Sequence, residues 1–289
     1  MKNIPECKFC GSIDHKILFP IKIKGTDANI VECKNCKLTF LNRQFDLEEI
    51  KSFYRQDYFK DHIKSETLRF LEENAARLFE RLKKYTAKPG KILDIGAATG
   101  SYLSVFKKGG WEVFGIELSD YIRDVARRVY SLSLFPDLKT AAFPDDYFDL
   151  IIMIQVIEHI SDPMDIIQNV ARVLKPGGIL YISTPNFASL NAQKMKAEWP
   201  SLHPGEHLFF YTPNTIKNIL MKCNLKIIKI ETMQLLVTGF HLNRVFGQKQ
   251  SGYIVKVSNV LFSGLKRKLR EWLGKILPGD GLEVIARKE

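Results

Sequence analysis

The chain has 289 residues, enough for one large domain or two smaller ones, and its apolar content of 45% can form a sizeable core. The formal net charge of +11 favours anionic partners or surfaces and carries no information about the fold. No run of about 18 uninterrupted apolar residues occurs, so we predict no membrane-spanning helix. The first residues lack the apolar core of a secretory signal. We therefore expect a cytoplasmic protein with reduced thiols.

Four of the five cysteines lie near the amino terminus in two C-x-x-C pairs, Cys7 with Cys10 and Cys33 with Cys36. The 22 residues between the pairs fit a tetrahedral four-cysteine zinc site. Few large apolar residues accompany them, so a metal would replace the missing core of a small zinc-ribbon module over residues 1–60. Disulfides or unrelated thiols are the alternatives. Four thiolates leave no open position for a substrate, so the zinc would be structural.

An aromatic cluster over residues 46–59 follows this module, with Phe53, Tyr54, Tyr58 and Phe59. Packing of the module onto the rest of the chain is the first interpretation, and a lid over a substrate site is the alternative. From Ser65 to Tyr85 apolar residues recur at three- and four-residue steps, which predicts a long helix with one buried face.

Residues 91–117 predict a strand, a glycine turn, a helix and a second strand. The turn is Gly96-Ala97-Ala98-Thr99-Gly100, and the second strand closes on Glu117. Such a unit forms a nucleoside-cofactor site at the carboxyl ends of parallel strands. The alternative is a glycine turn in an ordinary α/β protein.

The turn also indicates the kind of cofactor. Glu117 lies 21 residues after Gly96, close to the roughly 20-residue offset at which an acid meets a ribose hydroxyl. The spacing is G-x-x-x-G rather than the G-x-G-x-x-G of dinucleotide sites. Asp94, just before the turn, would repel a phosphate. A carboxylate there suits a ligand with positive charge, such as an amino group or a sulfonium.

The rest of the chain alternates between predicted helices and strands. Ser119 is the expected N-cap of the next helix. Gln155 and the Glu158-His159 pair follow a buried strand, at the edge that faces the ligand crevice in such sheets. The predicted helices cover 119–130, 162–174 and 211–223, and the predicted strands cover 131–134, 148–154, 179–183, 225–235 and 282–286.

The segment Leu93 to Gly100 resembles the first motif of the class I S-adenosylmethionine-dependent methyltransferases, and Glu117 matches their ribose-binding acid. Ala98 departs from the glycine that many members carry. Later segments match further motifs in order and spacing, at 148–151, 158–159, 174–178 and 183–186. The resemblance covers most of residues 1–235. It is closest to the branch of ubiquinone-biosynthesis O-methyltransferases and sugar or natural-product methyltransferases, a subset of which has an amino-terminal four-cysteine module.

This resemblance implies a Rossmann-like α/β domain over residues 61–289, with a seven-stranded, mostly parallel sheet and helices on both faces. It implies transfer of a methyl group from S-adenosylmethionine to a hydroxyl of a small molecule, such as a sugar, a natural product or a lipid-linked precursor. Asp137-Leu138 would lie near the adenine and Gln155 beside the methionine part; a surface loop and a strand end are the plainer interpretations of these residues. The remaining cofactor-binding residues would be Asp94, Gly96, Ala97, Gly100 and Glu117.

Methyl transfer to a hydroxyl requires alignment and a base, and histidine titrates in the useful range. His159 follows the fourth strand, and a polar loop carries His203 together with Glu206 and His207, a Glu-His pair that the resemblance also implies. We predict His207 as the first candidate for base or substrate contact, then His159, then His203. The alternatives are a divalent metal held by His203, His207 and a carboxylate, or structural hydrogen bonds.

Residues 237–277 form a long insertion. From Val257 to Leu277 a valine or leucine recurs every four residues. Six basic residues lie between Lys256 and Lys275 with one acid, which predicts a basic amphipathic helix. It could cover the substrate pocket, lie on an anionic membrane through residues 253–277, at the inner face, or form a homodimer face.

Nucleic-acid binding is the rival function, because the charge of +11 and the four-cysteine module are both compatible with RNA or DNA contact. Acids such as Asp27, Glu32 and Glu48 interrupt the lysines of the first module, so we expect no nucleic-acid partner. An RNA-modifying methyltransferase would combine both functions, and a non-enzymatic cofactor sensor is a third possibility.

Overall fold

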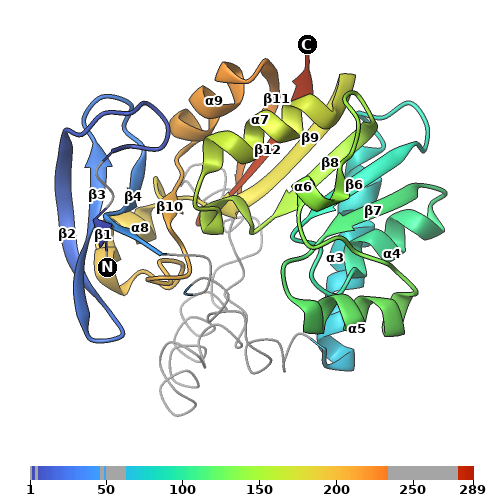
Figure 1. Cartoon of the computed structure of the whole chain (residues 1–289), viewed down its shortest axis with the longest axis horizontal. Helices are drawn as coiled ribbons and strands as arrows, with labels where there is room; N and C mark the ends of the chain where they lie inside the picture. Colours follow the sequence, from blue (N-terminus) through green and yellow to red (C-terminus); the bar gives the residue numbers. More distant parts are fainter. Residues whose placement is uncertain (1, 4–5, 46–48, 50–62, 234–278) are drawn as a thin grey trace, which may run out of the picture.

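The computed structural model describes residues 2–3, 6–45, 49, 63–233 and 279–289. The aromatic cluster Phe53, Tyr54, Tyr58 and Phe59 and the basic insertion at 237–277 lie outside these residues. Figure 1 shows a small antiparallel sheet near the amino terminus beside a larger α/β unit. Among the described helices, none combines the length and the apolar content that a membrane span requires.

The larger sheet has the strand order β11–β12–β9–β8–β6–β7. β6 (Lys91–Ile95) lies between β7 (Glu112–Ile116) and β8 (Phe148–Ile154), and it is parallel to both. β8 is also parallel to β9 (Leu174–Pro185). The carboxyl ends of these four strands therefore meet at one edge, which is where open α/β sheets bind ligands.

Two antiparallel strands complete this sheet. β12 (Gly281–Lys288) pairs with β9 on one side and with β11 (Leu225–Met233) on the other. The predicted Rossmann-like class is thus confirmed. Within the described ranges the sheet has six strands. The predicted strand at 131–134 is absent because Ser131 ends the preceding helix in the left-handed conformation, and Phe135 alone forms a parallel bridge to Ile116.

Helices cover both faces of the sheet because successive strand residues belong to two different cores (Figure 1). Leu93 and Ile151 pack in the core of α7 (Pro163–Val173) and α9 (Pro213–Lys222). Ile92 and Leu150, which directly precede them in the two strands, pack on the other face with α3 (Ser65–Leu82) and α4 (Ser101–Lys108). These near-continuous apolar strands are typical of a sheet buried on both faces.

Side-chain caps determine where three of these helices begin. The Ser119 hydroxyl accepts a hydrogen bond from the Ile122 N–H and caps α5 (Asp120–Tyr130), as predicted. Asp162 caps α7, and Thr212 forms a capping box at the start of α9. The short elements are α6 (Leu138–Ala141), η1 (Ile157–His159), α8 (Leu190–Met195) and η2 (Lys196–Glu198).

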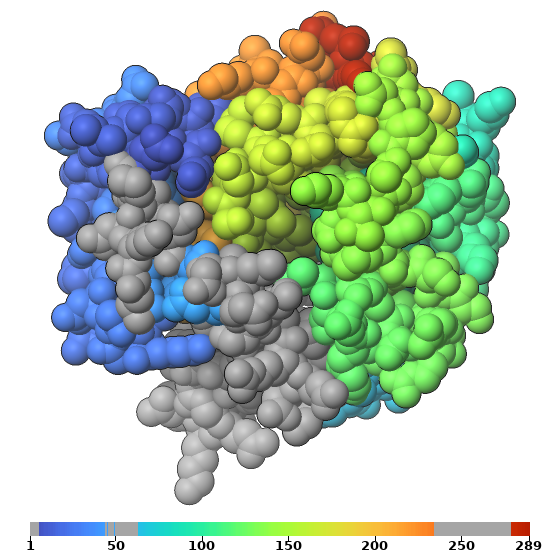
Figure 2. Space-filling view, viewed as in Figure 1, coloured from blue at the N-terminus to red at the C-terminus, as the bar shows by residue number. Residues whose placement is uncertain are grey.

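The small sheet has the order β10–β4–β3–β2, and its edge strand β10 comes from a part of the chain far from the other three strands. β2 (His15–Ile23), β3 (Thr26–Cys33) and β4 (Thr39–Leu41) are amino-terminal, whereas β10 (Phe209–Phe210) follows the predicted histidine loop. The α/β unit therefore completes the sheet of the small module, and the two pack side by side (Figure 2). β1 (Lys2–Asn3) and β5 (Arg43–Gln44) form a separate pair.

Candidate active site

The glycine turn joins the carboxyl end of β6 to α4 and folds back onto β7. The N–H groups of Gly96 and Ala97 both donate to the Ile116 carbonyl at 2.8 Å. Gly96 has φ +77°, and a Cβ there would lie 2.3 Å from Cγ2 of Val156. Gly100 has φ +81°, with Leu132 Cδ1 at 2.7 Å from such a Cβ. Both glycines are therefore required by conformation and by close packing.

Glu117 is held against this turn by main-chain donors. Its carboxylate accepts hydrogen bonds from the Ala98 N–H at 3.1 Å and from the Ser119 N–H at 2.8 Å. Burial raises the pKa of Glu117, and these backbone donors oppose the effect. Ala98 adopts φ +45° in the position where a glycine is common in the resembled family. The arrangement fixes a buried carboxylate whose remaining lone pairs can accept hydroxyl groups.

A second buried carboxylate, Asp94, lies beside Glu117. It is 3% exposed, and burial together with the nearby Glu117 charge raises its pKa well above the ordinary value. Two carboxyl groups at one turn disfavour an anionic ligand and favour a cationic one. This agrees with the sequence-based expectation of a sulfonium or amino group.

The loop after β7 brings Asp137 and Leu138 to the same edge. The Glu117 N–H donates to the Phe135 carbonyl at 2.9 Å, which places this loop beside the glycine turn. Asp137 caps α6 by accepting from the N–H and the hydroxyl of Thr140, and the hydrogen bond from the Thr140 backbone lowers the pKa of Asp137. The capping role was missed in the sequence, although an Asp-x-x-Thr pattern is its signal.

Gln155 directly follows β8 and adopts a left-handed conformation with φ +55°. Its N–H donates to the Ser183 carbonyl at 2.8 Å, and its side-chain amide donates to the Ser183 hydroxyl at 3.1 Å. Non-glycine residues with such backbone angles often mark functional sites. The structure thus gathers all eight predicted cofactor residues at the carboxyl edge of the sheet, namely Asp94, Gly96, Ala97, Gly100, Glu117, Asp137, Leu138 and Gln155.

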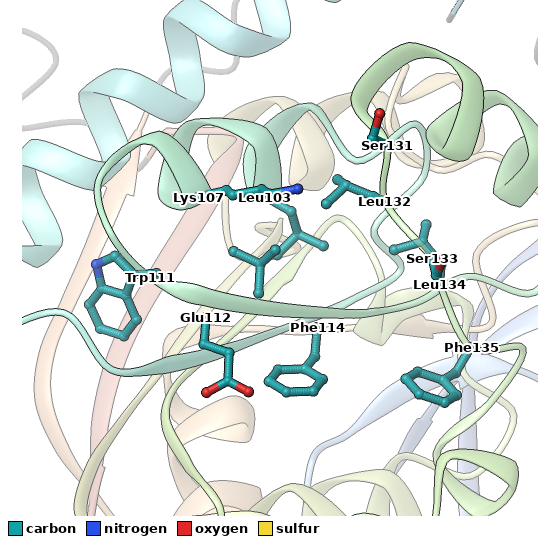
Figure 3. Close-up of a pocket in the computed structure, with 11 residues that line it drawn as sticks. Leu103, Lys107, Trp111, Glu112, Phe114, Ser131, Leu132, Ser133, Leu134 and Phe135 are labelled. Carbon is teal, nitrogen blue, oxygen red and sulfur yellow. The ribbon is translucent and has the colours of Figure 1, made fainter.

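A hollow of about 440 Å³ lies elsewhere, along the open side of β7. Figure 3 shows Leu103, Phe114 and Phe135 among its lining side chains. It lies where the predicted strand at 131–134 does not form beside β7, and the glycine turn does not line it. The candidate cofactor site therefore lies at the glycine turn and not in this hollow.

The three predicted histidines come together beyond β8. His159 lies in η1 and His207 in the loop before β10, and their rings are in edge-to-face contact with centroids 4.6 Å apart. The centroid of the His203 ring lies 5.0 Å from that of His207. Nδ1 of His159 bonds the Glu206 carbonyl, and Nδ1 of His207 bonds the Ser201 carbonyl, each at 2.9 Å. Because a carbonyl only accepts, both Nδ1 atoms carry the proton. Nε2 is therefore the basic atom of each ring.

Glu158 adjoins these rings; the sequence indicated it only as part of the Glu158-His159 pair after the strand, without a separate role. It is 1% exposed; Oε2 accepts from the Thr184 hydroxyl at 2.8 Å, and Oε1 is buried without a hydrogen-bond partner. Burial raises the pKa of Glu158 to about 8 and lowers that of His159 to about 4. A neutral carboxyl group therefore faces a neutral imidazole near neutral pH.

Glu158, His159 and His207 each offer one ligand atom, and these atoms lie within 4.8 Å of one another. Two imidazoles and one carboxylate are a donor set that divalent metals accept. The sequence-based alternative placed a metal on His203 and His207; the compact cluster contains His159 instead of His203. Glu206 contributes its main-chain carbonyl to this arrangement.

The four amino-terminal cysteines converge at the other candidate centre. Sγ of Cys7 lies 3.5 Å from that of Cys36, Cys10 and Cys33 are equally close, and all four sulfurs lie within 4.8 Å of one another. Tetrahedral zinc with bonds of about 2.3 Å would place its sulfurs about 3.8 Å apart. All four are free thiols rather than disulfides, and the hydrogen bond from Cys36 lowers the pKa of Cys7 to about 5.

Matched turns create this cluster. Gly11 N–H donates to the Cys7 carbonyl, and Lys37 N–H donates to the Cys33 carbonyl. Gly11 and Lys37 both adopt positive φ, +70° and +64°. Each turn aims two sulfurs at one point, so the donor set fits a structural zinc ion.

Fold and site together define an α/β protein that presents a nucleoside-cofactor turn with two buried carboxylates. The family model of the methyltransferase domain matches residues 67–230, more than half of the chain. The chain belongs to the methyltransferase domain family, and the resemblance seen in the sequence is confirmed.

Relatives fall in the branch expected from the sequence. Ubiquinone biosynthesis O-methyltransferase of Coxiella burnetii (strain RSA 331 / Henzerling II) is 29% identical over 157 residues, covering 52% of this chain and 66% of the relative. The enzyme of the same name from Actinobacillus pleuropneumoniae serotype 7 is 30% identical over 172 residues, covering 53% of this chain and 70% of the relative. This chain thus spans about two thirds of these relatives' length.

Solved structures share the fold. The S-adenosylmethionine-dependent methyltransferase of Archaeoglobus fulgidus has a TM-score of 0.52 at 22% identity and covers 75% of this chain and 94% of its own. Phosphoethanolamine N-methyltransferase 2 of Haemonchus contortus, solved with S-adenosyl-L-methionine, has a TM-score of 0.51 at 15% identity and covers 94% of this chain and 71% of its own.

Proposed function

We propose that the protein transfers the methyl group of S-adenosylmethionine to a hydroxyl of a small molecule, such as a sugar, a natural product or a lipid-linked precursor. The observation that supports this function best is the pair of buried carboxylates, Asp94 and Glu117, at the glycine turn. Glu117 would accept the ribose hydroxyls, and Asp94 would offset the positive charge of the cofactor. The names of the O-methyltransferase relatives support oxygen as the acceptor atom.

The histidine pair supplies the chemistry that oxygen methylation needs. As the acceptor oxygen bonds to the methyl carbon and the carbon–sulfur bond breaks, the hydroxyl proton must move to a base. The Ser201 carbonyl fixes the His207 tautomer and leaves Nε2 as the basic atom. His159, held the same way by the Glu206 carbonyl, is the second candidate.

The cofactor assignment is tested by Glu117→Gln. The control is Glu112→Gln, at the exposed start of β7, the strand that Glu117 follows. Removing charge-assisted hydrogen bonds, worth about 1.5–3 kcal/mol each, should weaken S-adenosylmethionine binding about tenfold to a hundredfold. Isothermal titration calorimetry measures this, and the control should bind like wild type. Unchanged affinity in Glu117→Gln would contradict the assignment. Mass spectrometry of a metabolite extract incubated with labelled cofactor would then identify the acceptor.

The base assignment is tested by His207→Ala. Loss of a general base should lower turnover by about 10²–10⁴-fold while cofactor affinity stays close to wild type. Because His207 is 6% exposed, thermal unfolding must first show that the variant is folded. Restoration of turnover by added imidazole would separate a chemical role from a structural one. A folded His207→Ala enzyme with the wild-type rate would exclude His207 as the base.

Further proposals concern metal and partners. We propose a structural zinc ion on Cys7, Cys10, Cys33 and Cys36, supported by the sulfur geometry. Cytoplasmic location stays a prediction. Association with an anionic membrane through 253–277 and a homodimer also stay predictions, since that segment lies outside the described residues. Methylated nucleosides in the same mass-spectrometry experiment would support the rival RNA-modifying function.

A further inference from the structure

Arg43 is a buried cation at the end of the small module. It begins β5, one residue beyond β4, the strand that pairs with β10, and it is only 6% exposed. Its Nε and Nη1 atoms are fully buried and have no hydrogen-bond partner. Arginine has five N–H donors and no acceptor, so each donor left without a partner in this buried position adds to the cost of burying the side chain.

The contacts that Arg43 does make are incomplete. Nη2 lies 3.5 Å from Oε1 of Glu49, longer than a good charge-assisted hydrogen bond, and the Glu49 side chain is 40% exposed. The guanidinium carbon lies 4.7 Å from the centre of the Phe45 ring. The ring supports the cation, but it offers no acceptor to Nε or Nη1. A buried charge with unmet donors is a site prepared for an anionic acceptor.

The position of Arg43 connects it to the candidate active site. Two residues earlier, the Leu41 N–H donates to the Leu208 carbonyl at 2.9 Å. The Leu208 N–H in turn donates to the Glu158 carbonyl at 2.8 Å, and Leu208 directly follows His207. The strand that leads into Arg43 is therefore bonded to the histidine loop, which is itself bonded to η1, the short helix after β8.

We propose that Arg43 binds an anionic group, a carboxylate or a phosphate, on the methyl acceptor. This inference rests on the proposed function, because it assigns one anchor of the acceptor to the small module and the reacting hydroxyl to the histidine pair. The substrate class is then a hydroxyl compound that also carries an acid or a phosphoester. Arginine suits this role because its donors match the oxygens of both anions.

The probes are inorganic phosphate and sodium acetate, titrated into the full-length protein at constant ionic strength with chloride as the balancing ion. Binding is followed by isothermal titration calorimetry. Wild type should bind at least one of the two anions, and Arg43→Gln should bind it at least tenfold more weakly. Arg43→Lys, which keeps the charge but loses the planar donors, should lie between them. The matched control is Arg77→Gln, on an arginine whose side chain is 69% exposed.

The preferred anion distinguishes a phosphoester from a carboxylate. Wild type that binds neither anion, or Arg43→Gln that binds like wild type, would overturn the inference, and so would an equal loss in Arg77→Gln. S-adenosylmethionine affinity is measured on the same samples. Intact cofactor binding without anion binding rejects the role of Arg43 alone, whereas failure to bind the cofactor rejects the proposed function.

Discussion

Single residues at the glycine turn are constrained in two separable ways. Gly96 has a left-handed backbone and packs so closely against Val156 that there is no room for a Cβ atom. Gly177 has nearly the same backbone angle, φ +78°, but open space around it. The two positions therefore separate conformational strain from steric overlap. Ala98, at φ +45°, shows that the turn can hold a residue other than glycine in the left-handed region.

Gly96→Ala should lower the free energy of unfolding by about 2–5 kcal/mol, from about 1–2 kcal/mol of backbone strain and about 1–3 kcal/mol of overpacking. Gly177→Ala should cost only the backbone part. Valine is stiff about χ1 and cannot rotate away easily. In a Val156→Ala background the cost of Gly96→Ala should therefore approach that of Gly177→Ala. Urea unfolding measures all four variants; equal costs in both backgrounds would show that Val156 is not the obstacle.

Glu158 makes stability depend on pH. Because burial raises its pKa to about 8, the native side chain keeps its proton where the unfolded one has lost it. The native state then binds more protons, so stability falls as pH rises towards 8. His159, whose pKa is lowered to about 4, acts in the opposite direction, but only below its ordinary pKa near 6.5.

The range above pH 6.5 therefore isolates the carboxyl group. From about pH 6.5 to pH 8, wild type should lose about 2 kcal/mol of unfolding free energy relative to Glu158→Gln, which cannot ionise. Urea titrations of both proteins across this range provide the measurement. Parallel pH profiles would mean that Glu158 is already ionised at neutral pH.

At the scale of elements, the four-cysteine module and the histidine loop share one sheet. β4 begins three residues after Cys36 and pairs with β10, which begins two residues after His207. A structural zinc ion would hold the turn that starts β4, and β4 holds β10 through main-chain hydrogen bonds. The module can therefore stabilise the loop that carries the candidate base.

Cys33→Ser should abolish zinc binding and loosen this shared sheet, whereas Cys223→Ser, on the one cysteine outside the cluster, should keep about one zinc ion per chain. Elemental analysis gives the zinc content. Hydrogen exchange at the Leu41 and Leu208 amides should accelerate at least tenfold in Cys33→Ser. Wild-type zinc content in Cys33→Ser would reject the site, and unchanged exchange in a zinc-free protein would reject the coupling.

At the scale of the whole molecule, the helix ends and strands that could be predicted are those set by interactions between residues close together in the chain. Helix starts at Ser119 and Asp162 follow from side chains that bond main-chain groups two or three residues away. Apolar periodicity predicted β8 to the residue. Lys175 to Gly178, which follow the predicted helix at 162–174, form part of β9, because the strand resumes pairing with β8 after these residues bulge out of register.

The sequence by itself determined the methyltransferase-like turn, its acid Glu117 and the four-cysteine module, because each depends on residues whose spacing along the chain dictates their geometry. Only the tertiary structure decided that Glu158, His159 and His207 form one cluster, that β10 completes the amino-terminal sheet, and that Arg43 is buried with unmet donors. These features depend on packing between segments far apart in the chain. A local sequence pattern does not indicate which distant polar groups will be buried together away from water.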